Sequence, residues 1–135
     1  YEEVTVTNSS EVKQAAETLA GKVDGIFIPN DSVIQSAMTT VTEVARDKKI
    51  PVYGSSKAMV LSGAFATIAI SDTEIGKLTA QMGLKYLKDG TAVKDIPSVV
   101  VPAEETVINQ NTLDALGVTV PDDIKNSAII VNDAE

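Results

Sequence analysis

The stretch VDGIFIPNDS (residues 23–32) decides the fold that we expect for this chain. Its centre, Gly25 to Ile28, is short and apolar on both faces, which is typical of a buried parallel strand. Pro29 ends the strand, because proline has no N–H to donate to a neighbouring strand. The stretch therefore predicts a strand, a tight polar turn and the start of a helix. In open α/β sheets, ligands bind at such turns, outside the carboxyl ends of the strands.

The helix after this turn has a predicted start and a predicted apolar face. Asp31 and Ser32 are both strong N-cap residues. Ser32 and Gln35 form a capping-box pattern, which satisfies two backbone N–H groups at the start of a helix. Apolar residues then recur at the spacing of one helix face, which we expect to pack on the sheet. That face consists of Val33, Ile34, Ala37, Met38, Val41, Val44 and Ala45.

Further strands and helices are predicted on both sides of this unit from periodicity, capping residues and turn residues. Strands are expected over residues 2–7, 50–54, 64–70 and 98–101, with an edge-like strand over 105–108 and a weak one over 128–131. Helices are expected from Asn8 and Glu11 to Gly21, from Ser71 and Glu74 to Gly90 with Met82 on its core face, and over 113–116 after an Asn111 cap. A short helical turn or loop is expected over 57–62, and a last short helical turn begins at Pro121.

The order of these elements predicts the fold class. Strands alternate with helices through short connections, which implies right-handed crossovers and a mostly parallel sheet with helices on both faces. We therefore expect an α/β fold of the doubly wound type. At 135 residues, the chain is expected to form a single domain. It begins at Tyr1 rather than at Met, so we expect a processed protein or a fragment.

Polar side chains follow three of the predicted parallel strands, at the point where each strand ends. The carboxyl ends of parallel strands meet at one edge of a sheet, so these side chains are expected to form one polar rim. Such a rim, with helix N-termini facing it, suits an anionic group such as a carboxylate. Each side chain also has a purely structural interpretation, as a helix cap or as an ordinary turn residue. The rim residues are Asn30, Asp31, Ser32, Ser55, Ser56, Ser71 and Asp72.

The composition excludes several classes of function. Eleven basic and 19 acidic residues give a formal charge of −8 without a basic cluster, which argues against nucleic acid and anionic membrane surfaces as partners. Cysteine and histidine are absent, which removes thiol nucleophiles, Ser-His triads and His-containing metal sites. The sequence contains no glycine-rich phosphate-binding motif, and we expect no cofactor and no metal. No apolar run approaches the roughly 20 residues of a membrane span.

Several motifs together resemble one protein family. They are residues 23–32, the runs KIPVYGSS (49–56) and EIGKLTA (74–80), and the tail motifs VIN (107–109) and LGVTVP (116–121). In this order along the chain, they resemble the substrate-binding proteins of ABC transporters with a type I periplasmic-binding fold, in the branch associated with aromatic amino acids. One motif departs from the family: many relatives have Gly-Val-Asp-Tyr-Tyr where this chain has AISDT (69–73).

The resemblance implies an architecture and partners. Members have two α/β lobes that close on a small ligand, and this chain resembles most of the C-terminal lobe, without the N-terminal lobe and without the first strand–helix unit of its own lobe. The three rim segments correspond to ligand-facing loops of the family, and Asp72 could hold an ammonium group. A small polar ligand such as an amino acid, an ABC permease and the N-terminal lobe are the implied partners. The implied location is extracytoplasmic, as a periplasmic protein or a cell-surface lipoprotein.

Two other classes of function stay open at this stage. The effector-binding domain of a LacI-like transcription regulator has the same general fold. An enzyme with Asp31 or Asp72 as a carboxylate base is disfavoured, because no nucleophile or cofactor motif accompanies these acids, and we expect no enzymatic activity. Apolar surface exposed by an absent lobe could also lead the chain to self-associate.

Overall fold

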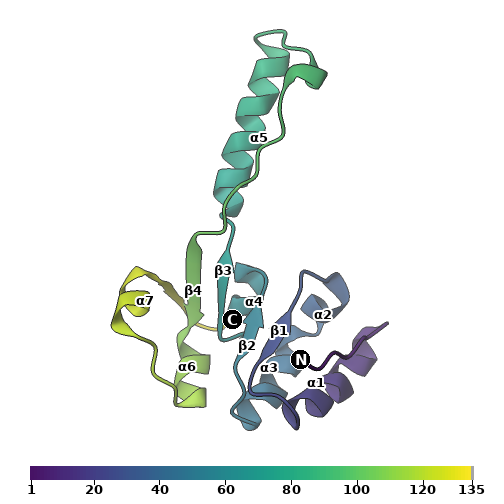
Figure 1. Ribbon diagram of the computed structural model, residues 1–135, viewed down its shortest axis with the longest axis vertical. Coiled ribbons are helices and arrows are strands. Elements are labelled where there is room, and N and C mark those ends of the chain that lie inside the picture. Colours follow the sequence, from purple (N-terminus) through teal and green to yellow (C-terminus); the bar gives the residue numbers. More distant parts are fainter. Residues whose placement is uncertain (135) are drawn as a thin grey trace.

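A five-stranded sheet forms the centre of the fold in the computed structural model, which describes residues 1–134 (Figure 1). β1, β2 and β3 are parallel, β4 is antiparallel to β3, and β5 is parallel to β4. The sheet is therefore mostly parallel, and the predicted α/β class is confirmed. The strands lie side by side in chain order, as β1 (Ile26–Ile28), β2 (Val52–Gly54), β3 (Ala66–Ala69), β4 (Glu105–Asn109) and β5 (Ile129–Val131).

One face of the sheet is covered by α1 (Val12–Ala20), α3 (Met38–Asp47) and α4 (Lys57–Leu61). Residues alternate along β1, so Ile26 and Ile28 are buried against these helices while Phe27 points to the other face. Met38 on α3 and Met59 on α4 are completely or almost completely buried in the same cluster. Burying a side chain of this size stabilises the fold by about 1.5–3 kcal/mol.

The second face of the sheet is only partly covered. A smaller cluster of Phe65, Ile108, Leu113 and Leu116 lies there, formed with α6 (Gln110–Leu116) and the segment that leads to α7 (Asp122–Ser127). Toward β1 this face is open, and the side chain of Phe27 is 67% exposed. The core of the chain is thus complete on one face of the sheet and incomplete on the other.

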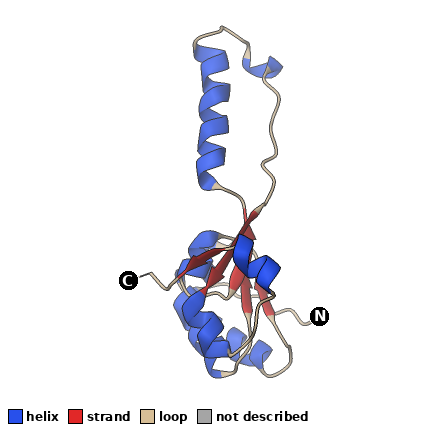
Figure 2. Cartoon of the chain, turned by 90° about the vertical axis from the view of Figure 1, so that its left-hand side faces the viewer, coloured by secondary structure: helices blue, strands red, loops and turns tan. Residues whose placement is uncertain are grey.

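A long arm leaves the sheet between β3 and β4. Residues 71–104, which we call the arm, comprise α5 (Asp72–Leu87), the short 3-10 helix η2 (Val93–Asp95) and an extended return segment. Figures 1 and 2 show the arm standing clear of the rest of the chain, which we call the body (residues 1–70 and 105–134). α5 has 16 residues, about 24 Å at 1.5 Å per residue, and none of them is buried.

The helix predicted after the β1 turn is present but interrupted. It consists of α2 (Ser32–Ser36) and α3, with a break at Ala37, whose φ of −110° and ψ of 17° are not helical. The start predicted at Asn8 and Glu11 is confirmed as the 3-10 helix η1 (Ser9–Glu11), where Asn8 caps Ser10 N–H and Glu11 accepts Thr7 N–H at 2.8 Å.

Several predictions about individual elements were wrong. Residues 2–7 and 98–101 form no strand: a groove of about 660 Å³ separates residues 1–6 from the open edge of β1, and residues 98–101 belong to the return segment, which stands clear of the sheet (Figure 1). Residues 105–108 belong to an interior strand, since β4 lies between β3 and β5. Met82 is not part of the buried core, because α5 has no core to face within residues 1–134. The cap of α6 is Asn109 rather than Asn111.

Within residues 1–134, no helix combines the length and the apolar character that a membrane crossing needs.

Candidate functional site

The three polar segments predicted as a rim lie at one edge of the sheet. β1, β2 and β3 are adjacent and parallel, with Ile26 opposite Val52 and Tyr53 opposite Ala66. Their carboxyl ends therefore point to the same edge, which is also the edge from which the arm leaves (Figure 1). The seven rim residues are Asn30, Asp31, Ser32, Ser55, Ser56, Ser71 and Asp72, and the sheet brings all three of their segments together.

In the segment after β1, two polar side chains have no hydrogen-bond partner within residues 1–134. Asp31 is the N-cap of α2, because its Oδ1 accepts the backbone N–H of Ile34 at 3.0 Å. The capping box predicted for Ser32 and Gln35 is therefore wrong: Ser32 is the first helical residue, one position too late to be the cap. Within residues 1–134, the side chains of Asn30 and Ser32 make no hydrogen bond, and both residues are exposed. They remain available to a ligand.

The segment after β2 is held close to its helix. Ser56 Oγ accepts the backbone N–H of Met59 at 3.4 Å and caps α4. Ser55 Oγ lies 3.7 Å from the Met59 sulfur, a weak contact that a better acceptor could replace. Because Gly54 has no side chain, Met59 of α4 can pack closely against the end of β2: a Cβ at position 54 would lie 2.7 Å from the Cβ of Met59. Both serines are half-buried beneath the rim surface.

The segment after β3 begins the arm. Ser71 Oγ accepts the backbone N–H of Glu74 at 3.3 Å, which confirms the predicted cap of α5. Asp72 is the first residue of α5, is exposed, and makes no side-chain hydrogen bond or ion pair within residues 1–134. Its carboxylate is therefore positioned at the junction between the body and the arm.

The chemistry of the rim favours binding over catalysis. Its seven residues include two carboxylates and no basic group, so the rim can accept a cation such as an ammonium group. Its hydroxyl, amide and helix N-terminal N–H groups can donate to a carboxylate. Within residues 1–134, no group of three or more Asp and Glu residues is arranged to hold a metal ion.

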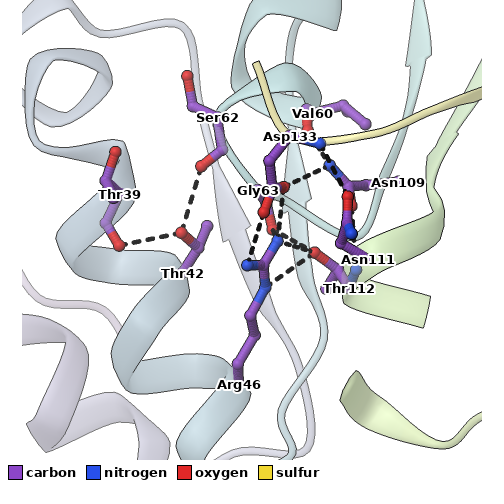
Figure 3. Close-up of polar contacts among 10 residues, drawn as sticks. All are labelled: Thr39, Thr42, Arg46, Val60, Ser62, Gly63, Asn109, Asn111, Thr112 and Asp133. Carbon is purple, nitrogen blue, oxygen red and sulfur yellow. Dashed lines mark hydrogen bonds and ion pairs between the residues drawn. The ribbon is translucent and has the colours of Figure 1, made fainter. Parts of the chain in front are cut away.

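The opposite edge of the sheet carries a polar network that the sequence did not reveal (Figure 3). Arg46 donates to both carboxylate oxygens of Asp133, at 2.9 and 2.7 Å, and to Thr112 Oγ1. Asn109 Nδ2 donates to Asp133 Oδ1 and to the Val60 carbonyl, both at 2.8 Å. The bonds from Arg46, and then that from Asn109, hold the pKa of Asp133 below its usual value of 3.8.

This network is structural rather than part of the candidate site. It lies where β3 begins and β4 and β5 end, and it fixes the C-terminal tail to α3 and α6. No local pattern could have predicted it, because Arg46 and Asp133 are 87 residues apart in the sequence. The sequence offers one weak signal: Arg46 is its single arginine, and the C-terminal tail carries the acidic residue Asp133, with which an arginine can pair.

Known proteins whose sequences are similar to that of this chain are described as binding proteins. The model of the family described as ABC transporter substrate binding protein matches residues 1–132. A tyrosine-binding protein of Clostridioides difficile (strain R20291) is 38% identical over 111 residues, which are 82% of this chain and 32% of that protein.

Solved structures are similar over nearly the whole chain. The ABC domain from Streptococcus pneumoniae in complex with L-Trp matches with a TM-score of 0.82 and 30% identity, covering 96% of this chain and 43% of that one. The ligand-free, open form of a substrate-binding protein with adhesive properties from Clostridium difficile matches with a TM-score of 0.81 and 31% identity, covering 98% and 44%. The chain thus spans less than half the length of these relatives.

Proposed function

Because the chain belongs to the family of ABC transporter substrate-binding proteins, we propose that it is one lobe of an extracytoplasmic receptor for an ABC importer. The lobe corresponds to most of the C-terminal half of a two-lobe protein. Its ligand, a small polar molecule of the amino-acid class, occupies a cleft between the rim and the other lobe. An ABC permease receives the ligand, and the receptor is periplasmic or held at the cell surface as a lipoprotein.

The position of the arm is the observation that carries this proposal. The arm leaves the body at the rim edge and extends about 24 Å beyond it along α5. Its apolar side chains are exposed, and an uncovered α5 of this composition requires a partner surface. A second lobe packed on the arm would therefore stand over the rim and enclose a ligand there. These exposed side chains include Ile75, Leu84, Tyr86, Leu87, Val93, Val99 and Val100.

The rim supplies groups for both ends of an amino acid. Asp72 suits the ammonium group, because its carboxylate has no partner within residues 1–134. Asn30 and Ser32 suit the carboxylate as side-chain donors. None of the seven rim residues is aromatic, so a ring on the ligand would pack against the other lobe. The relatives bound to L-Trp or named for tyrosine support an amino acid as the class of ligand.

Titration calorimetry of the full-length parent protein against a panel of amino acids tests the proposal. We expect heat of binding with at least one amino acid. Substitution Asp72→Asn should then weaken binding at least about tenfold, because a charge-assisted hydrogen bond contributes about 1.5–3 kcal/mol. Asp24→Asn is the matched control, since Asp24 is an exposed acid that precedes β1 at the opposite edge. Absence of heat with every amino acid would contradict the proposal.

A DNA-binding regulator is the less favoured alternative. The match over residues 1–132 is to transport receptors, and the acidic body offers no basic surface to DNA.

A further inference from the structure

The segments that follow β1, β2 and β3 each carry a charged side chain that forms no ion pair within residues 1–134. Asp31 follows β1, Lys57 follows β2 and Asp72 follows β3. All three residues are exposed, and the ion pairs of the described part of the chain join other residues. Along the rim, in the order of the strands, the charges are therefore negative, positive and negative.

The two acids lie on opposite sides of the segment that follows β2. Neighbouring strands of a sheet are about 4.8 Å apart, so β1 and β3, which flank β2, leave the sheet about 10 Å apart. Asp31 and Asp72 each lie three residues beyond the last residue of their strand. Each carboxylate is therefore placed to contact a different group of a ligand bound at the rim.

Other charged residues at the same edge add to its negative charge. Glu105 pairs with Ala69 at the carboxyl end of β3, so Glu104 and Glu105 at the start of β4 also lie at the rim edge. Glu74, in the first turn of α5, forms an ion pair with Lys77 at 3.6 Å, so these two charges offset each other. The acids of this edge therefore outnumber its bases, and the edge favours a ligand of net positive charge.

Closure of the proposed cleft makes an unpaired carboxylate unfavourable. When a second lobe closes over the rim, water is expelled from the side chains that face the ligand. A carboxylate that is buried without a cation loses its hydration and gains nothing in return. The ammonium group of a neutral amino acid neutralises Asp72 but leaves Asp31 unpaired. Asp31 Oδ1 accepts Ile34 N–H, whereas its Oδ2 accepts no hydrogen bond within residues 1–134.

We propose that the ligand is an amino acid with a cationic side chain, of the arginine and lysine class. Its ammonium group pairs with Asp72 and its side-chain cation with Asp31, while Lys57 attracts the carboxylate, beside the donors Asn30 and Ser32. The three charges of such a ligand complement those of the rim. Its side chain differs from that of L-Trp or tyrosine, the amino acids named for two relatives. The inference rests on the proposed function, because it requires that the rim binds an amino acid.

Titration calorimetry of the full-length parent protein with matched pairs of amino acids tests the inference. Arginine is compared with citrulline, which has nearly the same shape without the charge, and lysine with norleucine. We expect the cationic member of at least one pair to bind at least about tenfold more tightly than its uncharged counterpart. Preference for any amino acid without a cationic side chain overturns the inference and leaves the proposed function intact. Absence of heat with every amino acid contradicts the proposed function itself, and the inference with it.

The substitution Asp31→Asn tests which residue recognises the side-chain charge. Asparagine caps helices as well as aspartate does, so α2 keeps its start in this variant. The preferred cationic ligand should lose at least about tenfold more affinity than its uncharged counterpart. Asp24→Asn is the matched control, because Asp24 is an exposed acid at the opposite edge of the sheet, and it should leave the ratio of the two affinities unchanged. Equal losses for both ligands in Asp31→Asn would overturn the assignment of the side-chain cation to Asp31.

Discussion

The body and the arm differ sharply in how much apolar surface they bury. α4 in the body has only five residues, yet its Met59 and Val60 are completely buried. α5 in the arm has 16 residues and buries none. The stability of a helix in a protein comes mainly from packing of its apolar face rather than from its length. The short helix is therefore fixed by the sheet, while the long one gains no such packing from residues 1–134.

Truncation of a large side chain should show this difference most strongly. Met59→Ala in this chain should lower the free energy of unfolding by about 2–5 kcal/mol, because it leaves a cavity under the sheet. Leu87→Ala should change it by less than about 0.5 kcal/mol, because Leu87 is 80% exposed. Urea denaturation followed by circular dichroism measures both values. Similar losses for the two variants would mean that the arm packs on the body.

Adding a methyl group at glycines should have opposite effects in the two regions. Gly63 has a φ of +100°, and a Cβ there would lie 2.8 Å from Thr42 Oγ1 and 2.9 Å from Arg46 Nη2. Gly63→Ala should therefore cost about 2–3 kcal/mol, from backbone strain and from displaced hydrogen bonds. Gly76 lies inside α5 with no atom within 4 Å of a new Cβ, so Gly76→Ala should favour the helix by about 1 kcal/mol.

Denaturation midpoints give the first effect, and hydrogen exchange of the α5 amides gives the second. Destabilisation of this chain by Gly76→Ala would contradict the idea that α5 is unpartnered here. If the same substitution weakens the full-length parent protein, the other lobe approaches α5 closely at Gly76.

Local sequence patterns predicted most elements of the body, because the residues that determine each element are close together in the sequence. The strand ended by Pro29 and the helix start capped by Asn8 each depend on a few neighbouring residues. Parallel pairing of β1 to β3 then follows from the alternation of strands and helices, and the rim follows from the pairing. The fold class and the position of the candidate site were therefore accessible from the sequence.

The arm and the Arg46–Asp133 pair could not be predicted in the same way. The valines of residues 98–101 have the composition of a strand, but strand formation also needs a neighbouring edge, which the return segment lacks. The periodic face of α5 indicates that the helix is covered, but not which surface covers it. The Arg46–Asp133 pair joins distant residues, so no short window contains its signal.

The smallest expected effect concerns this pair, which fixes the tail to the body. Asp133 has a pKa lowered mainly by the hydrogen bonds from Arg46, so its carboxylate is stabilised in the folded state relative to the unfolded state. That contribution is present above the ordinary pKa of 3.8 and is lost as the pH falls through the lower pKa of the folded state. Because the pair is partly exposed, Asp133→Asn should cost at most about 1 kcal/mol at pH 7.

The difference in unfolding free energy between wild type and Asp133→Asn should therefore shrink below pH 3.8 and stay constant above about pH 5. Urea titrations at a series of pH values measure it. The pKa of Glu11 is also lowered, mainly by the hydrogen bond from the Thr7 backbone N–H, so only the difference between the two proteins isolates Asp133. Glu17→Gln is the control, because Glu17 is exposed and makes no side-chain hydrogen bond or ion pair within residues 1–134. A difference that does not change with pH would mean that the hydrogen bonds of Asp133 with Asn109 and Asn111 hold the tail without the charge of Asp133.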